Sequence, residues 1–247
     1  MNDTFVFNPI GIVRSCFTEK FGIPRQPRLA PAARATMEIL SPYDQDEAFS
    51  GLDAFSHLWL VFVFHGIPEG RWRPTVRPPR LGGNRRTGVF ATRSGFRPNP
   101  IGMSAVVLEG MRRHKGRLQL ELSGIDLLDR TPVLDIKPYI PYADCRPEAD
   151  GGFARERPKA VLRVRFAVRV RATLHAMPYP ERRHLVRLLV QVIQLDPRPA
   201  YYGDQRPKQA FGMHLGDWNV RWRLDGVVAT VIQLEPRPGR PISRDIA

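Results

Sequence analysis

Residues 92–104, TRSGFRPNPIGMS, decide which fold classes the first half of the chain can adopt. The segment places two prolines, two glycines and two arginines between apolar runs, and it contains no acid. Proline fixes φ and removes a main-chain donor, so the segment cannot continue a helix. A corner between two strands of a barrel and a rigid lip at a binding site are both open to it.

Short extended runs make up most of the first 140 residues. They are rich in Val, Ile, Phe and Leu, and Pro/Gly stretches separate them; the runs are FVFNPIGIVRS (5–15), ATMEIL (35–40), HLWLVFVFH (57–65), TGVFATRS (87–94), SAVVLEGM (104–111), RLQLELSGID (117–126) and PVLDIKPY (132–139). This pattern is typical of a small all-β barrel. One helix is predicted there, over residues 41–55, because acids fall in its first turn. No G-x-G-x-x-G follows a strand, so the usual dinucleotide-binding fingerprint is missing.

The chain beyond the barrel begins with a predicted linker. Residues 143–160 are polar and rich in proline and glycine, which is typical of a linker. Residues 160–174, AVLRVRFAVRVRATL, alternate apolar residues with arginines. This alternation predicts one strand with a buried face and a basic face.

A helix and a hairpin complete the predicted second unit. Residues 179–196 place leucines at helical spacing, with Pro180 near the start of the helix. Residues 211–226 and 227–238 predict two strands joined tightly at Asp225-Gly226. The fold class predicted from these patterns is mainly β, with a barrel followed by a small α+β domain.

The charge of the chain raises the question of a polyanionic partner, which composition alone leaves open. The formal net charge is +14 and the pI is about 10.7. Residues 151–247 contribute most of the excess, with eighteen basic against eight acidic residues. The segment 71–97 holds eight arginines and no acid, with Trp72 and Phe96 among them. Such a segment suits RNA, whose bases stack on aromatic and guanidinium planes; a solvated arginine-rich loop is the alternative.

The sequence lacks the motifs of several classes of enzyme and metal site. The chain has no G-x-S-x-G, its six histidines are scattered, and neither Cys16 nor Cys145 belongs to a metal-binding spacing. His65 ends an apolar run at a glycine, where it either closes a strand or lines a pocket. Asp126, Asp129 and Asp135 fall within ten residues, and the DRTP that begins at Asp129 predicts a turn. Turn acids are structural in most proteins, but they also recognise amines and ribose hydroxyls.

The expected location is cytoplasmic. No apolar run approaches the length of a membrane span, and the N-terminal residues lack the basic-then-apolar order of a signal peptide. We therefore expect no membrane partner.

Several long motifs resemble a known family. They are EKFGIPRQPRLAP (19–31), GLDAFSHLWLVFVFH (51–65), WRPTVRPPRLGGN (72–84), GVFATRSGFRPNPIGMS (88–104), DLLDRTPVLDIKPYIPY (126–142), DPRPAYYGD (196–204) and DWNVRWR (217–223). Together they resemble the TsaA-like family, and within it the bacterial TrmO-type tRNA methyltransferases. The likeness runs over nearly the whole chain.

The resemblance implies a fold, a cofactor and a substrate. It implies an S-adenosylmethionine-binding, single-sheet β-barrel over residues 1–145, a linker over 146–160 and a small α+β domain over 161–247, assembled as a homodimer. The implied reaction methylates N6 of threonylcarbamoyladenosine at position 37, beside the anticodon of threonine tRNA; no DNA partner is expected. Two alternatives stay open, a non-catalytic RNA-binding or regulatory module and a methyltransferase with another acceptor.

The resemblance also implies site residues. The implied cofactor contacts are Pro24, Arg25, Gln26, Phe64, His65, Arg93, Gly102, Asp129, Arg130, Thr131 and Pro132. Relatives carry a small residue in place of Arg130, so a positive φ there would strain the arginine. Asp126 is our candidate for the catalytic base, and Asp129 is expected to orient the cofactor. We further expect Arg97 to face RNA and the basic face of residues 162–172 to dock tRNA.

Overall fold

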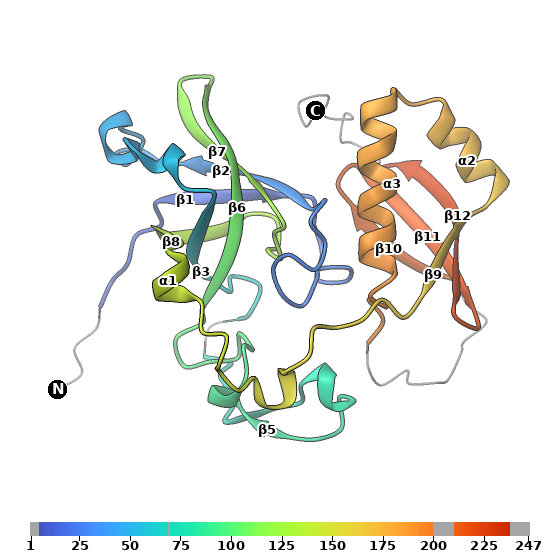
Figure 1. Cartoon of the computed structure of the whole chain (residues 1–247), viewed down its shortest axis with the longest axis horizontal. Coiled ribbons are helices and arrows are strands. Elements are labelled where there is room, and N and C mark those ends of the chain that lie inside the picture. Colours follow the sequence, from blue (N-terminus) through green and yellow to red (C-terminus); the bar gives the residue numbers. More distant parts are fainter. Residues whose placement is uncertain (1–4, 69, 200–209, 238–247) are drawn as a thin grey trace.

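The structure is a computed structural model that describes residues 5–68, 70–199 and 210–237. Figure 1 shows a barrel and a smaller C-terminal unit side by side. The segment that connects them runs along the bottom of that view. Part of the motif DPRPAYYGD, from residue 200 onward, lies outside the described residues, as does Pro238 at the end of the last predicted strand.

Six antiparallel strands close the predicted barrel. Their order around it is β1-β2-β7-β6-β3-β8. The strands are β1 (Gly11–Ser15), β2 (Arg34–Ile39), β3 (His57–Val63), β6 (Ile101–His114), β7 (Arg117–Ser123) and β8 (Thr131–Pro138). The mainly β class and the N-terminal barrel expected from the sequence are therefore confirmed.

Side-chain alternation explains why these segments form a barrel. Along β3, Leu58, Leu60 and Phe62 are buried while their neighbours are only partly covered. In β7 the same alternation buries Leu118 and Leu120. Because successive side chains of a strand point to opposite faces, one face of each strand fills the barrel interior.

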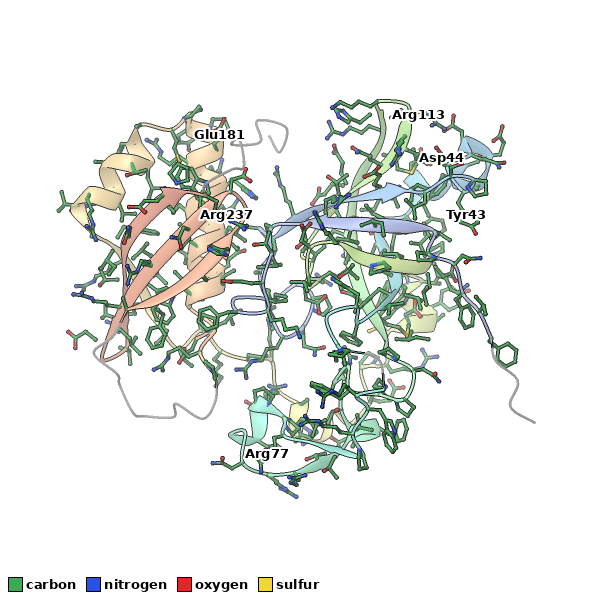
Figure 2. The ribbon with its side chains drawn as sticks, turned by 180° about the vertical axis from the view of Figure 1, so that it is seen from behind. Tyr43, Asp44, Arg77, Arg113, Glu181 and Arg237 are labelled. Carbon is green, nitrogen blue, oxygen red and sulfur yellow. The ribbon has the colours of Figure 1, made fainter. Side chains whose placement is uncertain are left out.

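The helix predicted over residues 41–55 is wrong. The segment forms two 3-10 turns, Asp46–Phe49 and Leu52–Ala54, separated by Gly51 at φ 81°. A left-handed residue at that point breaks any continuous helix. The segment packs instead on the hairpin of β6 and β7, where Arg113 donates to the carbonyl oxygen of Asp44 at 2.9 Å. Arg113 and Asp44 lie close together in Figure 2.

The strand predicted over residues 87–94 is mostly wrong too. Only β5 (Thr87–Gly88) is extended, and it pairs with β4 (Thr75–Val76) in a two-stranded sheet. The chain then curls into a 3-10 turn at Val89–Ala91. This lobe lies below the barrel in Figure 1, and Arg77 lies in it in Figure 2.

A four-stranded sheet with two helices forms the C-terminal unit. The strand order is β10-β11-β12-β9, with β9 parallel to β12. The elements are β9 (Arg163–Phe166), α2 (Val168–His175), α3 (Tyr179–Ile193), β10 (Phe211–Leu215), β11 (Trp218–Asp225) and β12 (Val228–Pro236). The helix α3 crosses one face of this sheet in Figure 1.

The single basic strand predicted over residues 160–174 is wrong. The strand β9 stops at Phe166, and the rest of the segment is the helix α2. Val170 and Leu174 are both buried, and their spacing of four places them on one face of that helix. The continuous basic strand face that we expected to dock tRNA therefore does not exist.

The predicted helix and hairpin are present. The helix α3 has a proline in its first turn and buries Leu185, Leu188, Leu189, Val192 and Ile193. Asp225 pairs with Val228, which leaves a tight two-residue turn between β11 and β12. Residues 211–226 form two strands rather than one, because a turn at Gly216 and Asp217 divides them.

The segment between the two units lies against the lobe of β4 and β5 and against the loop before β2. It contains the short helix α1 (Pro141–Asp144) and a 3-10 turn at Gly152–Ala154. Arg80 donates to the carbonyl oxygens of Ala154 and Glu156, and Arg157 donates to the carbonyl oxygen of Arg28 at 3.0 Å.

None of the described helices combines the length and the apolarity that crossing a membrane requires.

Candidate functional site

A cavity of about 700 Å³ lies at one end of the barrel. Its walls come from the loop before β2, the end of β3, the segment 92–97, the start of β6 and the loop after β7. The lining is largely apolar, with a few charged and amide groups among the apolar side chains. Pockets of this size and composition are typical of sites for small organic ligands.

Most of the predicted site residues meet at this cavity. Those that line it are Pro24, Arg25, Gln26, Phe64, His65, Arg93, Gly102, Asp126 and Thr131. Asp129, Arg130 and Pro132 do not line it. Segments separated by about a hundred residues in sequence therefore converge on one space.

Arg93 and Gln26 join two walls of the cavity. The Nη1 of Arg93 donates to the Oε1 of Gln26 at 2.6 Å. Arg93 belongs to the segment that follows the turn at Val89–Ala91, whereas Gln26 belongs to the loop before β2. The hydrogen bond therefore fixes a guanidinium group at the cavity wall, where it can bind an anionic group of a ligand.

Asp126 is a carboxylate with a raised pKa. Burial raises the pKa of Asp126 to about 6, although a hydrogen bond from Ser104 and the positive charge of Arg93 oppose the rise. The Oγ of Ser104, which is fully buried, donates to Oδ1 of Asp126 at 2.6 Å. A carboxylate with this pKa is ionised at neutral pH and is a stronger base than an ordinary aspartate.

Two glycines of the segment 92–104 accommodate the phenylalanines at the end of β3. A Cβ at Gly102 would overlap the ring of Phe62, with which Gly102 pairs across the strands. A Cβ at Gly95 would lie 2.6 Å from Cγ of Phe64. We expected Gly102 to let the main chain approach a ligand, but the group that lies closest to it is the Phe62 ring.

The predicted turn at residues 129–132 is present, and it is tied to β1. The main-chain N–H of Ser15 donates to the Asp129 carboxylate at 3.0 Å, and the N–H of Asp129 donates to the carbonyl oxygen of Phe17 at 2.7 Å. Pro132 pairs with Ile12. Asp129 thus holds the turn in place, and the structure gives it this contact rather than a position on the cavity wall.

Arg130 and Thr131 have different positions in that turn. Arg130 has φ 65°, the left-handed region in which a side chain is strained. Its N–H donates to the carbonyl oxygen of Val13 at 2.8 Å. Thr131 faces the cavity, where its Oγ1 lies 3.5 Å from Nδ1 of His65.

Arg97 has a structural role that the sequence did not predict. Its Nη1 donates to the carbonyl oxygens of Thr92 at 2.8 Å and Val89 at 3.2 Å, and its guanidinium lies 5.4 Å from the centre of the Phe90 ring. Arg97 also lines the cavity, and the expectation that it faces RNA stays a prediction. Its hydrogen bonds fix the curled backbone that immediately precedes Arg93.

The C-terminal unit holds the loop that contains Arg25 and Gln26. The N–H of Ala32 donates to Oε1 of Gln191 in α3 at 2.7 Å. A Cβ at Gly22 would lie 3.2 Å from Sδ of Met213 in β10. Burial lowers the pKa of Arg25, and Asp196, beyond α3, opposes that change.

Further contacts join the units beside this loop. Glu19 accepts a hydrogen bond from the N–H of His214 at 2.8 Å, and Arg237 donates to Oγ1 of Thr18 at 2.7 Å. In Figure 2 Arg237 lies on the side of the C-terminal unit that faces the barrel.

Sequence reasoning missed several residues of the site. Ser104 ends one of the family motifs, but nothing in the sequence indicated that it donates a hydrogen bond to Asp126. Lys20, Trp59, Phe62, Ile67, Thr92, Phe96, Ile101, Met103, Leu127 and Leu128 also line the cavity. Most of these lie in or beside the motifs, which was the available signal.

No metal centre is found among residues 5–68, 70–199 and 210–237: no group of three or more His, Cys, Asp or Glu side chains there could hold an ion.

Comparisons with known proteins agree with this architecture. The family model of the tRNA-methyltransferase O N-terminal domain matches residues 12–145, and that of the TrmO C-terminal domain matches residues 159–237. The chain is 48% identical over 236 residues to a tRNA (adenine(37)-N6)-methyltransferase of Escherichia coli K12, covering 95% of this chain and 99% of that protein.

Two further relatives come from Pseudomonas aeruginosa. One, named putative S-adenosylmethionine-dependent methyltransferase RcsF, is 52% identical over 219 residues, covering 89% of this chain and 92% of that protein. A crystal structure of TrmO superposes with a TM-score of 0.76 at 42% identity, covering 94% of this chain and 99% of that one. With both of its units matched, the chain belongs to the tRNA-methyltransferase O family.

Proposed function

We propose that the protein is an S-adenosylmethionine-dependent tRNA methyltransferase that acts on N6 of adenosine 37, carried as threonylcarbamoyladenosine beside the anticodon of threonine tRNA. The E. coli relative is named for methylation of this nitrogen, and the P. aeruginosa relative is named for the cofactor. The observation that carries the proposal for this chain is that Asp126 and Arg93 line one cavity.

The residues around the cavity fit the proposed cofactor. S-adenosylmethionine has a carboxylate, which Arg93 or Arg25 can bind, and an adenine and ribose, which the apolar wall of Phe64 and Leu127 can cover. We propose Pro24, Gln26, His65, Gly102 and Thr131 as further contacts, and Asp129, Arg130 and Pro132 as the turn that positions Thr131.

When bound, S-adenosylmethionine supplies a methyl group on a positively charged sulfur, which passes to N6 as the sulfur–carbon bond breaks. The N6 lone pair is delocalised into the adenine ring and the carbamoyl group, so N6 is a weak nucleophile until it loses its proton. Asp126 accepts that proton in this proposal, and Ser104 holds the accepting carboxylate in place. The cavity walls contribute by aligning N6 with the methyl group.

Methyl transfer to defined tRNAs tests the proposal. We expect the enzyme to transfer labelled methyl from S-adenosylmethionine to threonine tRNA that carries threonylcarbamoyladenosine, and nucleoside mass spectrometry to place the label on that residue. Transfer to a protein or a small molecule instead would favour the other acceptor. Salt-dependent tRNA binding without cofactor binding would favour a non-catalytic RNA-binding module.

We also propose that the enzyme is a homodimer and acts in the cytoplasm. Ile101 and Met103, at the mouth of the cavity, are 37% and 56% exposed, and a second copy would cover such apolar side chains. Light scattering on the purified protein tests the dimer. A Met103→Glu variant that becomes monomeric would support this face as the contact, and a wild-type monomer would overturn the proposal.

A further inference from the structure

A second, basic cavity adjoins the first one. It measures about 640 Å³ and lies between the loop before β2, the start of the loop after β7 and the segment 154–158. Gln26 lines both cavities. Gly124 lines the second cavity, and Asp126, two residues later in the same loop, lines the first. The two cavities are therefore adjacent, because they share Gln26 and because the loop after β7 lines both of them.

Arginines dominate the charged groups of the second cavity. Arg28, Arg80, Arg155 and Arg157 line it, with Glu156 as the only acid among its described lining residues. Arg80 and Arg157 donate hydrogen bonds to main-chain carbonyl oxygens. These oxygens carry no net charge, so the positive charges of the two arginines are not neutralised by them. Arg155 alone of the four pairs with a carboxylate within the described part of the chain, that of Asp150 at 2.9 Å.

Arg28 lies at the centre of this arrangement. Its own N–H donates to the carbonyl oxygen of Gly124 at 2.7 Å, and its carbonyl oxygen accepts from Arg157. These contacts hold the backbone in the left-handed region, at φ 62°. The positive charge of Arg28 lowers the pKa of His57, and that of Arg80 lowers the pKa of Arg25, although burial is the larger cause in both. The cavity is thus a region of positive potential.

We propose that this second cavity, which we call the arginine groove, binds backbone phosphates of the tRNA beside the nucleotide that enters the first cavity. The proposal rests on the proposed function. A base that leaves its stack to enter a pocket keeps its sugar–phosphate backbone outside, next to the pocket mouth. The arginine groove shares Gln26 with the first cavity, and guanidinium groups bind phosphate oxygens through two parallel hydrogen bonds.

Salt-dependent tRNA binding tests the groove. We expect Arg28→Gln to weaken tRNA binding about fivefold and to lower the slope of log affinity against log salt by about 0.7, the value for one lost phosphate contact to a single strand. Arg28→Lys retains the charge and should restore most of the slope. The main-chain contacts of residue 28 persist in both variants, and circular dichroism checks that they fold.

Two control measurements distinguish binding in the arginine groove from a general effect of net charge and from a role in cofactor binding. Arg223→Gln removes one charge from an exposed arginine of β11 that lines neither cavity. Its tRNA affinity should stay near that of the wild type; a loss equal to that of Arg28→Gln would mean that only net charge matters and would overturn the groove. S-adenosylmethionine affinity should be unchanged in Arg28→Gln, and a loss there would assign Arg28 to the first cavity instead.

Comparing tRNA with and without the threonylcarbamoyl group shows whether the arginine groove binds a backbone phosphate or a group on the modified base. A backbone contact predicts the same fold-loss for tRNA with and without the threonylcarbamoyl group. A loss confined to the modified tRNA would overturn the phosphate assignment, because the group recognised would then be on the base. If the wild-type enzyme binds tRNA with this slope but transfers no methyl, the proposed function fails while the groove stands.

Discussion

Gly102 of β6 pairs with Phe62 of β3, and the Phe62 ring occupies the space that a side chain at position 102 would need. The ring is almost fully buried and packs edge-on against Phe64 at 5.0 Å between centroids. The end of β3 that forms the cavity wall is therefore shaped by a glycine on the neighbouring strand.

Replacing Gly102 with alanine should displace this ring. We expect Gly102→Ala to destabilise the protein by about 1–3 kcal/mol, as overpacking does, and to weaken S-adenosylmethionine binding. Thermal melting and calorimetric titration measure the two effects. Gly212→Ala in β10 is the control, because a Cβ there meets nothing closer than 4.0 Å. Equal behaviour of the two variants would show that the Phe62 contact does not shape the cavity.

Removing the Asp126 carboxylate should abolish most of the turnover. Asp126→Asn keeps the shape and an oxygen for Ser104, so we expect a fall in kcat of roughly a hundredfold or more with tRNA binding retained. In the wild type, kcat should rise as pH increases through about 6, where Asp126 ionises. A variant with wild-type kcat would remove Asp126 from the mechanism.

The same substitution should change the pH dependence of stability. Burial raises the pKa of Asp126 from 3.8 to about 6, so its contribution to stability is full below pH 3.8 and is lost as pH rises through about 6. Asp126→Asn has no charge to bury, and it should be more stable than the wild type at pH 8, on the order of 2 kcal/mol. The difference should shrink towards pH 4 in denaturant titrations.

Ser104 should set the pH at which Asp126 becomes a base. Its hydrogen bond lowers the pKa of Asp126, so Ser104→Ala should move the rising limb of the kcat profile to higher pH. Ser104→Thr retains the hydroxyl and should restore the profile in part. A loss of kcat at every pH without a shift would indicate a packing effect alone.

Arg93 should separate cofactor binding from tRNA binding. Arg93→Ala removes the guanidinium that Gln26 holds, so we expect S-adenosylmethionine affinity to fall by about tenfold or more while tRNA binding stays intact. Arg77→Ala, an exposed arginine of the same lobe that does not line the cavity, serves as the control. Unchanged cofactor affinity in Arg93→Ala would remove Arg93 from the cofactor site.

Arg130 should be a position where a smaller residue stabilises the protein. An L side chain at φ 65° is strained, so Arg130→Gly should raise the free energy of unfolding by up to about 1 kcal/mol. Arg223→Gly, within β11, should have the opposite effect. A destabilised Arg130→Gly would mean that the guanidinium makes a contact that outweighs the backbone strain.

The sequence predicted the barrel well because period-2 burial is a local signal. The runs of β3 and β7 show it, and the helix α3 shows the corresponding helical period. Residues 160–174 were wrongly predicted as one strand because arginines at alternate positions continue from β9 into α2. In α2 the burial of Val170 and Leu174 on one face favours a helix instead. The curl at Val89–Ala91 depends on Arg97 reaching back to carbonyl oxygens, a contact without a local pattern.

The candidate site was predictable mainly through the family motifs. They placed Gln26 and Arg93 together although no spacing rule connects them, whereas Asp126 was a candidate because of its carboxylate chemistry. The partner of each group, such as Ser104 for Asp126 and Ser15 for Asp129, depends on how the barrel closes. Those contacts bridge residues far apart in sequence, so residue types alone do not reveal them.

The hydrogen bond from Ala32 to Gln191 makes a loop of the barrel depend on the C-terminal unit. A barrel that acquired a different C-terminal partner would lose the acceptor for Ala32 and the methionine beside Gly22, at opposite ends of the loop that carries Arg25 and Gln26. Such a chimera would need a new anchor for that loop before it could hold a ligand well. The C-terminal unit therefore affects the ligand site indirectly, because it fixes the loop that carries two of the residues lining the cavity.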